Sequence, residues 1–353
     1  MKKIKILLAG YVNFPNAQNV NCDNIAKYLN KDIFDVHVLA LSTKPINKQM
    51  YKNSNIHVHR IIGHKFVWYI QRYLNMYLND YDIYYLPKME SVDINFVKKF
   101  KNKKCIISSV EGVVGKQIKI DDLKSKNYYF SCSNIFSISQ CIRESVKKIW
   151  GKNTSVLYLG IDDKQKNIIK KQQIKNIVWI GSFIERKRPK FFIELAKEFT
   201  NLNFYMIGDG ELFDDINNYV EKHNIKNVHF LGRIQNYEVY KNLKNMDLLV
   251  MTSETEGLPK VIGEAMSYSI PVIYINENYD VDYINNDTNG YAVKNLEQMK
   301  EKIYYLVVNN EKYQSLSKNA FYTIHNYYWR NLIKDYENYF ISVYKKYEKD
   351  KRI

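Results

Sequence analysis

Short apolar runs rich in β-branched residues alternate with helical patterns along the whole chain of 353 residues. This alternation is typical of parallel β-sheets whose strands are joined by crossover helices. In the first half, strands are expected at 4–9, 36–41, 56–61, 83–86, 105–109, 136–139 and 156–159. In the second half, they are expected at 177–180, 204–207, 228–231, 248–251, 271–275 and 291–293.

The polar, lysine-rich stretch 162–176 separates the two series of strands and is expected to be a linker. A chain of this length suits two domains, each with its own core. We therefore predict an α/β protein with two doubly wound, Rossmann-like domains over 1–165 and 166–335, facing each other across a cleft. A C-terminal helix over 336–353 is expected to pack back on the first domain.

Neither a membrane-spanning segment nor a secretory leader is expected. No apolar run approaches the ~20 residues that a membrane-spanning helix needs. The opening MKKIKILLAGY has a short apolar run without a small-residue cleavage site, so it is interpreted as a first strand. The four cysteines show no C-x-x-C pairing, and buried or free thiols are expected rather than zinc ligands or disulfides. These features together favour a cytoplasmic protein.

The net charge of +16 is concentrated in the first half, where 26 Lys+Arg face 13 Asp+Glu. A cluster of lysines between 98 and 104 could attract phosphates or anionic lipid head groups, and an ordinary lysine-rich surface is the alternative. The segment 66–78 has apolar residues at helical spacing, which suits either a membrane-surface helix or a helix packed in the core or between the domains. A nucleic-acid partner is not expected, because no helix-turn-helix or RNA-binding pattern accompanies the charge.

Basic residues follow the strand expected at 177–180. Gly181 ends this strand and would let the chain turn close to a ligand, while Arg186 and Lys187 lead into a helix opened by Pro189. Cationic side chains at the N-terminus of a helix suit a diphosphate, and solvated surface charge is the alternative.

Glycines end the next two strands. Gly208 and Gly210 form a G-x-G after the strand at 204–207, and Gly232 follows the strand at 228–231. The third glycine of the dinucleotide fingerprint is absent, which gives nicotinamide chemistry little support. A phosphate, ribose or base could approach the backbone at these glycines, or they could simply form turns.

Two carboxylates stand eight positions apart in the segment SETEGLPKVIGEAM, which begins at Ser253. Glu256 follows the strand at 248–251, and Glu264 lies in the helix expected over 259–269. Open α/β sheets bind ligands outside the carboxyl ends of their strands. Both carboxylates are therefore expected to face one ligand-binding crevice.

This E-x7-E segment resembles the signature of glycosyltransferase family 4, the retaining, nucleotide-sugar-dependent enzymes of GT-B fold. The order of the preceding elements is also similar, with GSFIERK, GDG and FLGR each following a strand. Tyr158-Leu159-Gly160-Ile161-Asp162 resembles the family's domain junction, with Leu159 where an asparagine is usual. The resemblance covers 155–345 with a specific pattern and the first half with a loose one.

The resemblance implies roles in binding a sugar donor. Glu264 would accept hydrogen bonds from the ribose hydroxyls, and Glu256 would engage the transferred sugar and support the charge that develops on it. Lys187 would neutralise the diphosphate leaving group. The family arginine that usually assists it is Ser182 here, and Arg186 or Arg188 could substitute for that arginine, although neither is at the expected position.

Further donor contacts follow from the same resemblance. The backbone N–H groups of Gly257, Leu258 and Lys260 would lie against the donor at the start of the helix. The four glycines at 181, 208, 210 and 232 would complete that wall of the site.

The first half would then bind the acceptor. Gly10 and Asn13 belong to the loop after the first strand, which is glycine-rich in the family. Many relatives place a histidine after the fifth strand, where this chain offers Glu111 as a second catalytic candidate. An acid that only caps a loop is the alternative for Glu111.

The implied activity is that of a hexosyltransferase that moves a sugar from a nucleotide-diphosphate sugar to a hydroxyl of a glycan or lipid-linked acceptor. Bacterial surface polysaccharide, lipopolysaccharide or capsule biosynthesis is the expected context. A sugar-nucleotide epimerase of the same fold, and a degenerate homologue acting as a partner subunit, are the alternatives.

No cofactor or metal is expected, because cations and oriented N–H dipoles can stabilise the leaving group. The D-x-D pairs at 80–82 and 280–282 are close to chance in a chain with 37 acidic residues, and the seven histidines show no metal-ligand spacing along the sequence. The basic first half favours peripheral association with the anionic inner face of the plasma membrane.

Overall fold

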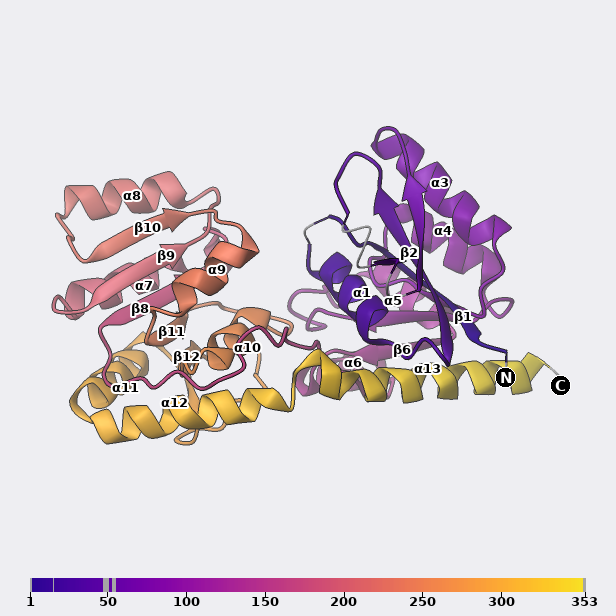
Figure 1. Cartoon of the computed structure of the whole chain (residues 1–353). Helices are drawn as coiled ribbons and strands as arrows, with labels where there is room; N and C mark the ends of the chain where they lie inside the picture. The colour runs from indigo at the N-terminus through magenta and orange to yellow at the C-terminus, as the bar shows by residue number, and fades with distance from the viewer. Residues whose placement is uncertain (1, 15, 47–50, 53–54, 352–353) are drawn as a thin grey trace. The chain divides into compact units, whose positions relative to one another are not determined.

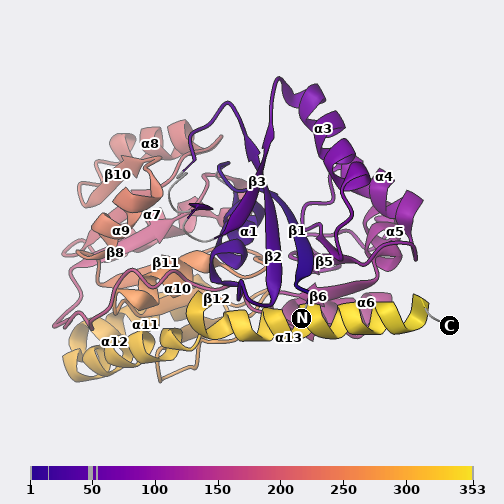
Figure 2. The same ribbon diagram turned by 45° about the vertical axis from the view of Figure 1, so that its right-hand side comes forward.

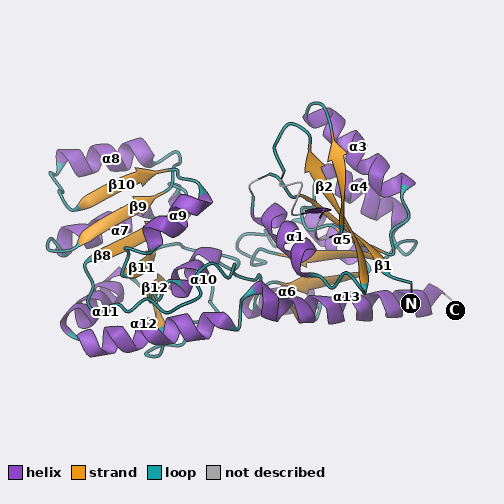
Figure 3. Ribbon diagram, in the orientation of Figure 1, coloured by secondary structure: helices purple, strands orange, loops and turns teal. Residues whose placement is uncertain are grey.

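The computed structural model describes residues 2–14, 16–46, 51–52 and 55–351, which fold as two compact units. Unit 1 comprises Met1–Gly160 and Trp329–Ile353, and unit 2 comprises Ile161–Tyr328. Each unit is a parallel β-sheet flanked by helices (Figure 1, Figure 3).

Every strand expected from the sequence is present, with ends that shift by up to about three residues. In unit 1 the sheet order is β3-β2-β1-β4-β5-β6-β7, and each neighbouring pair is parallel. The elements of unit 1 are β1 Ile4–Tyr11, α1 Ala17–Tyr28, β2 Phe34–Leu41, β3 Ile56–Ile61, α3 Lys65–Leu78, β4 Ile83–Tyr85, α4 Ser91–Phe100, β5 Ile106–Val110, α5 Leu123–Ser131, β6 Asn134–Ser137, α6 Gln140–Trp150, β7 Ser155–Val156 and α13 Trp329–Lys351.

Unit 2 repeats this architecture with six parallel strands in the order β10-β9-β8-β11-β12-β13. Its elements are β8 Asn176–Ile180, η1 Glu185–Lys187, α7 Pro189–Glu198, β9 Asn203–Ile207, α8 Phe213–Lys222, β10 Val228–Gly232, α9 Asn236–Leu243, β11 Leu248–Met251, α10 Lys260–Ser267, β12 Val272–Ile275, β13 Gly290–Val293, α11 Leu296–Val308 and α12 Asn310–His325. Its core includes the buried aromatic side chains of Trp179, Phe183, Phe192 and Phe204.

The unit boundaries differ from those expected from the sequence. The chain leaves unit 1 after Gly160, rather than after residue 165, and returns to it at Trp329, rather than at residue 336. Gly160 packs under the Trp329 indole so closely that a Cβ at Gly160 would lie 2.4 Å from the ring. This contact fixes both boundaries at once, because it joins the last residue before unit 2 to the first residue after it.

The stretch 162–176 belongs to unit 2 and is not a free linker. Ile174 is part of the core, and the Ile169 N–H donates to Ser269 Oγ at 3.0 Å. The Lys171 ammonium donates to the Lys244 carbonyl at 3.1 Å, so even a lysine of this polar stretch is held by the unit. The composition of this stretch suggested a linker because composition cannot show these contacts, which are made with residues 70 or more positions away in the sequence.

Helix α13 packs along unit 1 in both views (Figure 1, Figure 2). Phe340 contacts the rings of Phe34 and Tyr85, and Tyr336 contacts Phe136. The Asn30 N–H donates to a Glu337 carboxylate oxygen at 2.7 Å. The C-terminal helix is thus an integral part of unit 1, although residues 352–353 of the range expected for it lie outside the described residues.

Helix α3 leaves most of its apolar residues exposed or half-buried. It lies beside α4 (Figure 2), and its buried residues are Arg72 and Met76. The Arg72 guanidinium donates to both carboxylate oxygens of Asp93 on α4 at 2.7–3.0 Å, and both side chains are fully buried. Phe66 is 76% exposed and Leu78 is 72% exposed. Packing of this apolar face in the core of unit 1 is therefore wrong, and packing between the domains stays a prediction.

The sequence predicts neither a membrane-spanning helix nor disulfide bonds. Among the residues that the structure describes, no helix combines the length and apolar character needed to cross a membrane. No disulfide joins the four described cysteines, and Cys22, Cys105 and Cys132 are buried.

Candidate functional site

The sheet of unit 2 has a topological switch point between its two central strands. The chain runs outward from β8 through β9 to β10, and from β11 through β12 to β13 on the other side. Open α/β sheets bind ligands at such a point, outside the carboxyl ends of the strands. The loop over 181–188 follows β8 and the loop over 252–259 follows β11, so both leave the sheet at this point.

Hydrogen bonds join these two loops. The Thr252 hydroxyl lies 2.7 Å from the Lys187 carbonyl oxygen, to which it can donate, and it accepts a hydrogen bond from Trp179 Nε1 at 3.0 Å. The Glu254 N–H donates to the Arg186 carbonyl at 2.8 Å. Since Trp179 is anchored in the core, these bonds give both loops a fixed position at the end of the sheet.

Glu256 meets two cations across the switch point. Lys187 Nζ donates to Glu256 Oε1, and Arg186 Nη1 lies 3.2 Å from Glu256 Oε2. Glu256 is 8% exposed, and a buried carboxylate needs such partners to stay charged. The structure thus brings together three site residues predicted from the sequence, although 69 positions separate Lys187 from Glu256.

Glu264 has a different set of partners. It lies on α10, where the Tyr240 hydroxyl donates to Glu264 Oε1 at 3.1 Å. Burial, and then the negative charge of Glu264, raise the pKa of Tyr240, so this hydroxyl stays protonated and remains a donor. The Tyr240 ring stacks on Tyr268, with 6.2 Å between the ring centroids, and the Lys164 ammonium lies over it. Sequence reasoning missed Tyr240, because nothing in the E-x7-E segment points to α9.

The G-x-G after β9 interlocks with the loop after β8. Gly208 has a φ of +141°, and a Cβ on it would lie 1.8 Å from the Gly181 carbonyl oxygen. A Cβ on Gly210 would lie 2.7 Å from the Phe183 carbonyl oxygen. Gly232, with a φ of +66°, would meet no atom within 4 Å. The first two glycines are therefore required by close packing of main chains, whereas Gly232 is required only by its backbone conformation.

The residues predicted to offer N–H groups lie at the start of α10. Gly257 and Leu258 precede the helix, and Lys260 is its first residue. Pro259 is the N-cap residue rather than the first helical residue, which moves the helix start by one position from the expected one. The first N–H groups of a helix have no intrahelical acceptor, so this terminus can bind an anionic ligand.

Two acceptor-side candidates in unit 1 have internal roles. A Cβ on Gly10 would lie 2.8 Å from Cys22 Cβ, so this glycine lets β1 approach α1. The Asn13 amide donates to the carbonyls of Leu41 and Lys44 at 2.7 and 2.9 Å, and it accepts from the Leu41 N–H at 2.8 Å. These contacts account for both residues without a ligand.

Glu111 follows β5 and joins a buried polar chain. The Ser109 hydroxyl donates to Glu111 Oε1 at 2.8 Å, and the Tyr85 hydroxyl donates to Ser109 Oγ at 3.0 Å. Burial, and then the Glu111 charge, raise the pKa of Tyr85 well above its usual range. Glu111 therefore lies at the carboxyl end of a strand, as expected for a site residue, with its carboxylate oriented by Ser109.

Unit 1 has its own switch point between β1 and β4. A cavity lies there that the sequence did not predict. Tyr11, Trp68, Lys88 and Glu90 are among the residues that line this cavity of about 140 Å³. The Lys88 ammonium lies 4.6 Å from the centroid of the Tyr11 ring. Within the part of the chain that the structure describes, Tyr11 Oη and Glu90 Oε2 are buried without a hydrogen-bond partner. Tyr11 directly follows Gly10, at the end of the first strand. This position in the sequence could have identified Tyr11 as a candidate site residue.

The comparisons with known proteins agree with this geometry. Residues 161–322, nearly the whole of unit 2, match the family model "Glycosyl transferases group 1". An uncharacterized glycosyltransferase of Methanocaldococcus jannaschii is 29% identical over 189 residues, which are 53% of this chain and 53% of the relative. The UDP-Gal:alpha-D-GlcNAc-diphosphoundecaprenol alpha-1,3-galactosyltransferase of Escherichia coli is 31% identical over 140 residues, 38% of this chain and 36% of the relative. The chain thus spans about half the length, or less, of these curated relatives.

The whole chain is also similar to solved structures. HepE of Anabaena in complex with UDP and glucose has a TM-score of 0.79 at 15% identity, covering 96% of this chain and 100% of that chain. With its two Rossmann-like sheets, this protein has the GT-B fold of glycosyltransferases, and unit 2 carries the sequence pattern of their group 1.

Proposed function

We propose that this protein transfers a sugar from a nucleoside-diphosphate sugar to a hydroxyl of a glycan or lipid-linked acceptor, with retention of the anomeric configuration. The named relatives support this donor and acceptor chemistry, because one uses UDP-Gal and a diphosphoundecaprenol acceptor and another binds UDP and glucose. They favour a uridine nucleotide as the donor. The context that we propose is surface polysaccharide synthesis.

The contact between Lys187 and Glu256 at the switch point is the observation that carries the proposal. Breaking the bond between sugar and phosphate leaves a diphosphate anion and a positively charged anomeric centre. Such a transition state needs cations and a carboxylate within a few ångströms of each other. Lys187, Arg186 and Glu256 supply them from two loops that are joined by hydrogen bonds.

A bound donor would redistribute these contacts. The diphosphate competes for Lys187 and Arg186, which releases the carboxylate of Glu256 from its two ion pairs toward the sugar. Glu264 accepts the Tyr240 hydrogen bond at Oε1 and can accept the ribose hydroxyls at its other oxygen. No step in this scheme needs a metal ion, because the two cations and the N–H groups at the start of α10 supply the positive charge.

The acceptor would bind to unit 1. We place its reacting hydroxyl near Glu111, in the loops that follow β1, β4 and β5. The cavity beside Tyr11 and Trp68 suits a sugar ring, because aromatic faces pack on its C–H groups and the polar residues Lys88 and Glu90 line the same cavity. Gly10 and Asn13 would act by shaping this loop, in keeping with their internal contacts.

A membrane surface would be the partner of α3 and α4. The exposed apolar residues of α3, together with α4, form a groove of about 600 Å³. The lysines at 98, 99, 101 and 103, at and beyond the end of α4, are exposed. Apolar side chains beside a cationic cluster suit the surface of an anionic bilayer, where a lipid-linked acceptor would be located.

Liposome flotation tests this part of the proposal. Binding should require anionic lipid and should fall in a Phe66→Ser/Leu78→Ser variant, whose changes lie on exposed positions. The same partitioning on neutral and anionic vesicles would contradict the proposed membrane surface. A Tyr304→Ser variant, which changes an exposed residue of unit 2, is the control.

The donor is tested by thermal unfolding in the presence of UDP, GDP, ADP and CMP sugars. A donor at 100 times its Kd adds about 2.7 kcal/mol to the free energy of unfolding. The Lys187→Met variant should lose most of the shift, because it removes a cation from the diphosphate site. If no nucleotide sugar raises the melting temperature of the wild type, the proposed donor site is wrong.

Product analysis distinguishes the proposed glycosyltransferase from the two alternatives, an epimerase and a degenerate partner subunit. A sugar-nucleotide epimerase would consume the donor equally with and without an acceptor. A degenerate partner subunit would bind the donor without turning it over. Transfer that depends on an added acceptor, with a product of the donor's anomeric configuration, is the outcome that the proposal predicts.

A further inference from the structure

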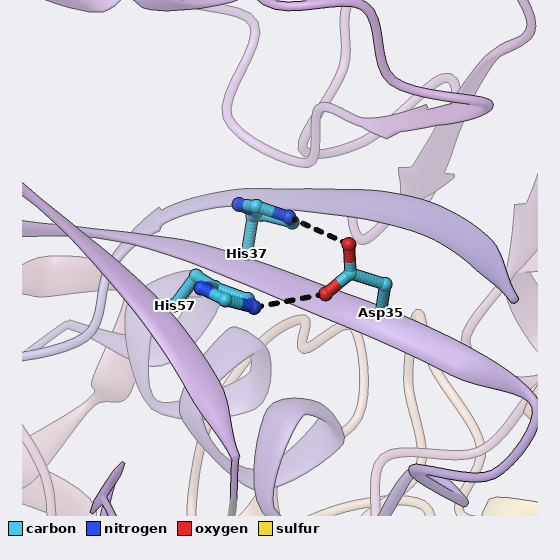
Figure 4. Close-up of side chains that lie close together, drawn as sticks. All are labelled: Asp35, His37 and His57. Carbon is cyan, nitrogen blue, oxygen red and sulfur yellow. Dashed lines mark hydrogen bonds and ion pairs between the residues drawn. The ribbon is translucent and has the colours of Figure 1, made fainter.

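Three side chains of metal-binding type converge on neighbouring strands of unit 1 (Figure 4). Asp35 and His37 stand two positions apart on β2 and therefore on the same face of the sheet. The parallel register pairs His37 with His57 on β3. Sequence spacing did not reveal the cluster, because 20 positions separate the contributions of the two strands.

The distances between the ligand atoms suit one shared ion. His37 Nε2 lies 3.2 Å from Asp35 Oδ2, and His57 Nε2 lies 3.0 Å from Asp35 Oδ1. The possible ligand atoms of the three residues all lie within 4.8 Å of one another. Atoms bound at ~2.0–2.1 Å to a tetrahedral zinc ion are roughly 3.3 Å apart. To bind one ion, the ligand atoms must therefore move closer, and the exposed His57 ring must turn out of its stack with His37.

A second layer of contacts orients the buried histidine. His37 Nδ1 lies 2.8 Å from His59 Nε2, which in turn lies 3.3 Å from the Tyr81 hydroxyl. The rings of His37 and His57 are stacked, with 4.5 Å between their centroids. Histidines that bind metals usually hydrogen-bond through their other ring nitrogen, which fixes the ring and directs the free nitrogen at the ion.

The cluster is anchored on one side and accessible on the other. The side chain of His37 is 8% exposed, that of Asp35 34% and that of His57 61%. Strand β3 is at the edge of the sheet, so His57 is reached from solvent. Three protein ligands with one open side leave a coordination position for water or another ligand.

We propose that Asp35, His37 and His57 bind one divalent transition-metal ion of the zinc class. Two imidazoles and a carboxylate favour zinc, cobalt or nickel over magnesium and calcium, which prefer all-oxygen sites. Lys3, Lys31 and Lys52 line a cavity together with Asp35 and His57, and their charge disfavours ions held mainly by electrostatics. The bound ion would tie the edge strand β3 to β2.

The same contacts can be explained by hydrogen bonds without a metal. Nε2–H groups of His37 and His57 could each donate to one Asp35 oxygen, with His59 donating to His37 Nδ1. The two explanations differ in a measurable way, because the hydrogen-bonded network has no affinity for zinc beyond that of ordinary surface histidines.

The test is metal binding by the full chain. Titration with Co²⁺, followed by visible absorption, and competition with Zn²⁺ should show one ion per chain, unaffected by millimolar Mg²⁺. His57→Ala and Asp35→Asn should each weaken binding at least tenfold. His64→Ala, which changes an exposed histidine of the same unit, should leave the affinity unchanged.

Circular dichroism and thermal unfolding check that each variant folds, which is expected since His57 lies at an exposed edge. Equal affinity and stoichiometry in the wild type and His57→Ala would overturn the metal site and leave the hydrogen-bonded network. This result is independent of the donor site in unit 2, which shares no residue with the cluster.

Discussion

The close approach of Gly208 to Gly181 predicts that adding one methyl group at residue 208 disrupts the proposed donor site. In Gly208→Ala the new Cβ would stand 1.8 Å from the Gly181 carbonyl oxygen, whereas real Cβ contacts essentially never fall below 3.0 Å. The two loops must therefore separate by about 1 Å or more. Their bonds from Gly208 N–H to the Gly232 carbonyl and from Gly181 N–H to the Ile207 carbonyl, at 2.9 and 3.0 Å, would be stretched.

The expected loss in the free energy of unfolding follows from these contacts. Two weakened main-chain hydrogen bonds cost about 1 kcal/mol each, and the positive φ costs a further ~1–2 kcal/mol for a residue with a Cβ. The free energy of unfolding of unit 2 should fall by about 3–4 kcal/mol. Gly232→Ala is the matched control, because Gly232 also has a positive φ but no atom within 4 Å of the new methyl group. Its cost should be only about 1 kcal/mol.

Urea unfolding of both variants, with hydrogen exchange of the β8 and β9 amides, measures the two costs in unit 2. Donor binding should weaken in Gly208→Ala, because the displaced loop carries Lys187. Equal losses of stability in the two variants would rule out the close contact with Gly181 as the cause, since backbone conformation alone would then explain both glycines.

Three further predictions concern single contacts. Tyr240→Phe should weaken nucleoside-diphosphate binding about tenfold, measured by calorimetry, because a hydrogen bond to the charged Glu264 contributes ~1.5 kcal/mol; unchanged affinity would remove Tyr240 from the site. Burial raises the pKa of the Cys22 thiol from 9.0 to about 12, so the unfolded chain loses a proton above pH 9 that the folded chain retains. Stability should therefore fall as the pH rises from 9 towards 12, and at pH 10 Cys22 should account for about 1.4 kcal/mol of the fall. Urea unfolding at pH 8 and pH 10 checks this, because Cys22→Ala should reduce the fall by that amount, and an identical fall would contradict it. Arg72→Met should cost unit 1 about 3–5 kcal/mol, because Asp93 would remain buried without its partner, and adding Asp93→Leu should recover part of this loss.

The sequence predicts the sheets well because the relevant signal is local. A β-branched run of four to eight residues between helical patterns is visible without knowledge of its neighbours. The orientation of α3 was not visible in the same way. Helical spacing shows that Phe66, Ile70 and Leu74 share a face, but it does not show which face packs inward. That choice depends on the ion pair of Arg72 with Asp93, 21 positions away.

The candidate site was also predicted only in part, because local motifs were visible in the sequence and contacts between elements were not. The motif around Glu256 identifies the loop, and the basic run identifies Lys187. Their contact depends on β8 and β11 being neighbours, which is a property of the sheet order. Tyr240 and the histidine cluster were missed for the same reason, since each depends on a partner from another element. The D-x-H and H-x-H spacings become informative only once the register of β2 and β3 is known.

Release of UDP from UDP-sugars by Glu256→Gln, compared with Glu254→Gln, tests whether Glu256 supports sugar transfer at the switch point of unit 2. Both changes remove one negative charge from the same loop, but Glu254 is exposed and lies 4.0 Å from Arg188, whereas Glu256 contacts Lys187 and Arg186. For Glu256→Gln we expect kcat to fall at least about 100-fold, as for loss of a group that stabilises the transition state, and for Glu254→Gln we expect near wild-type turnover. Undiminished turnover in Glu256→Gln would contradict the assignment of this switch point as the catalytic site.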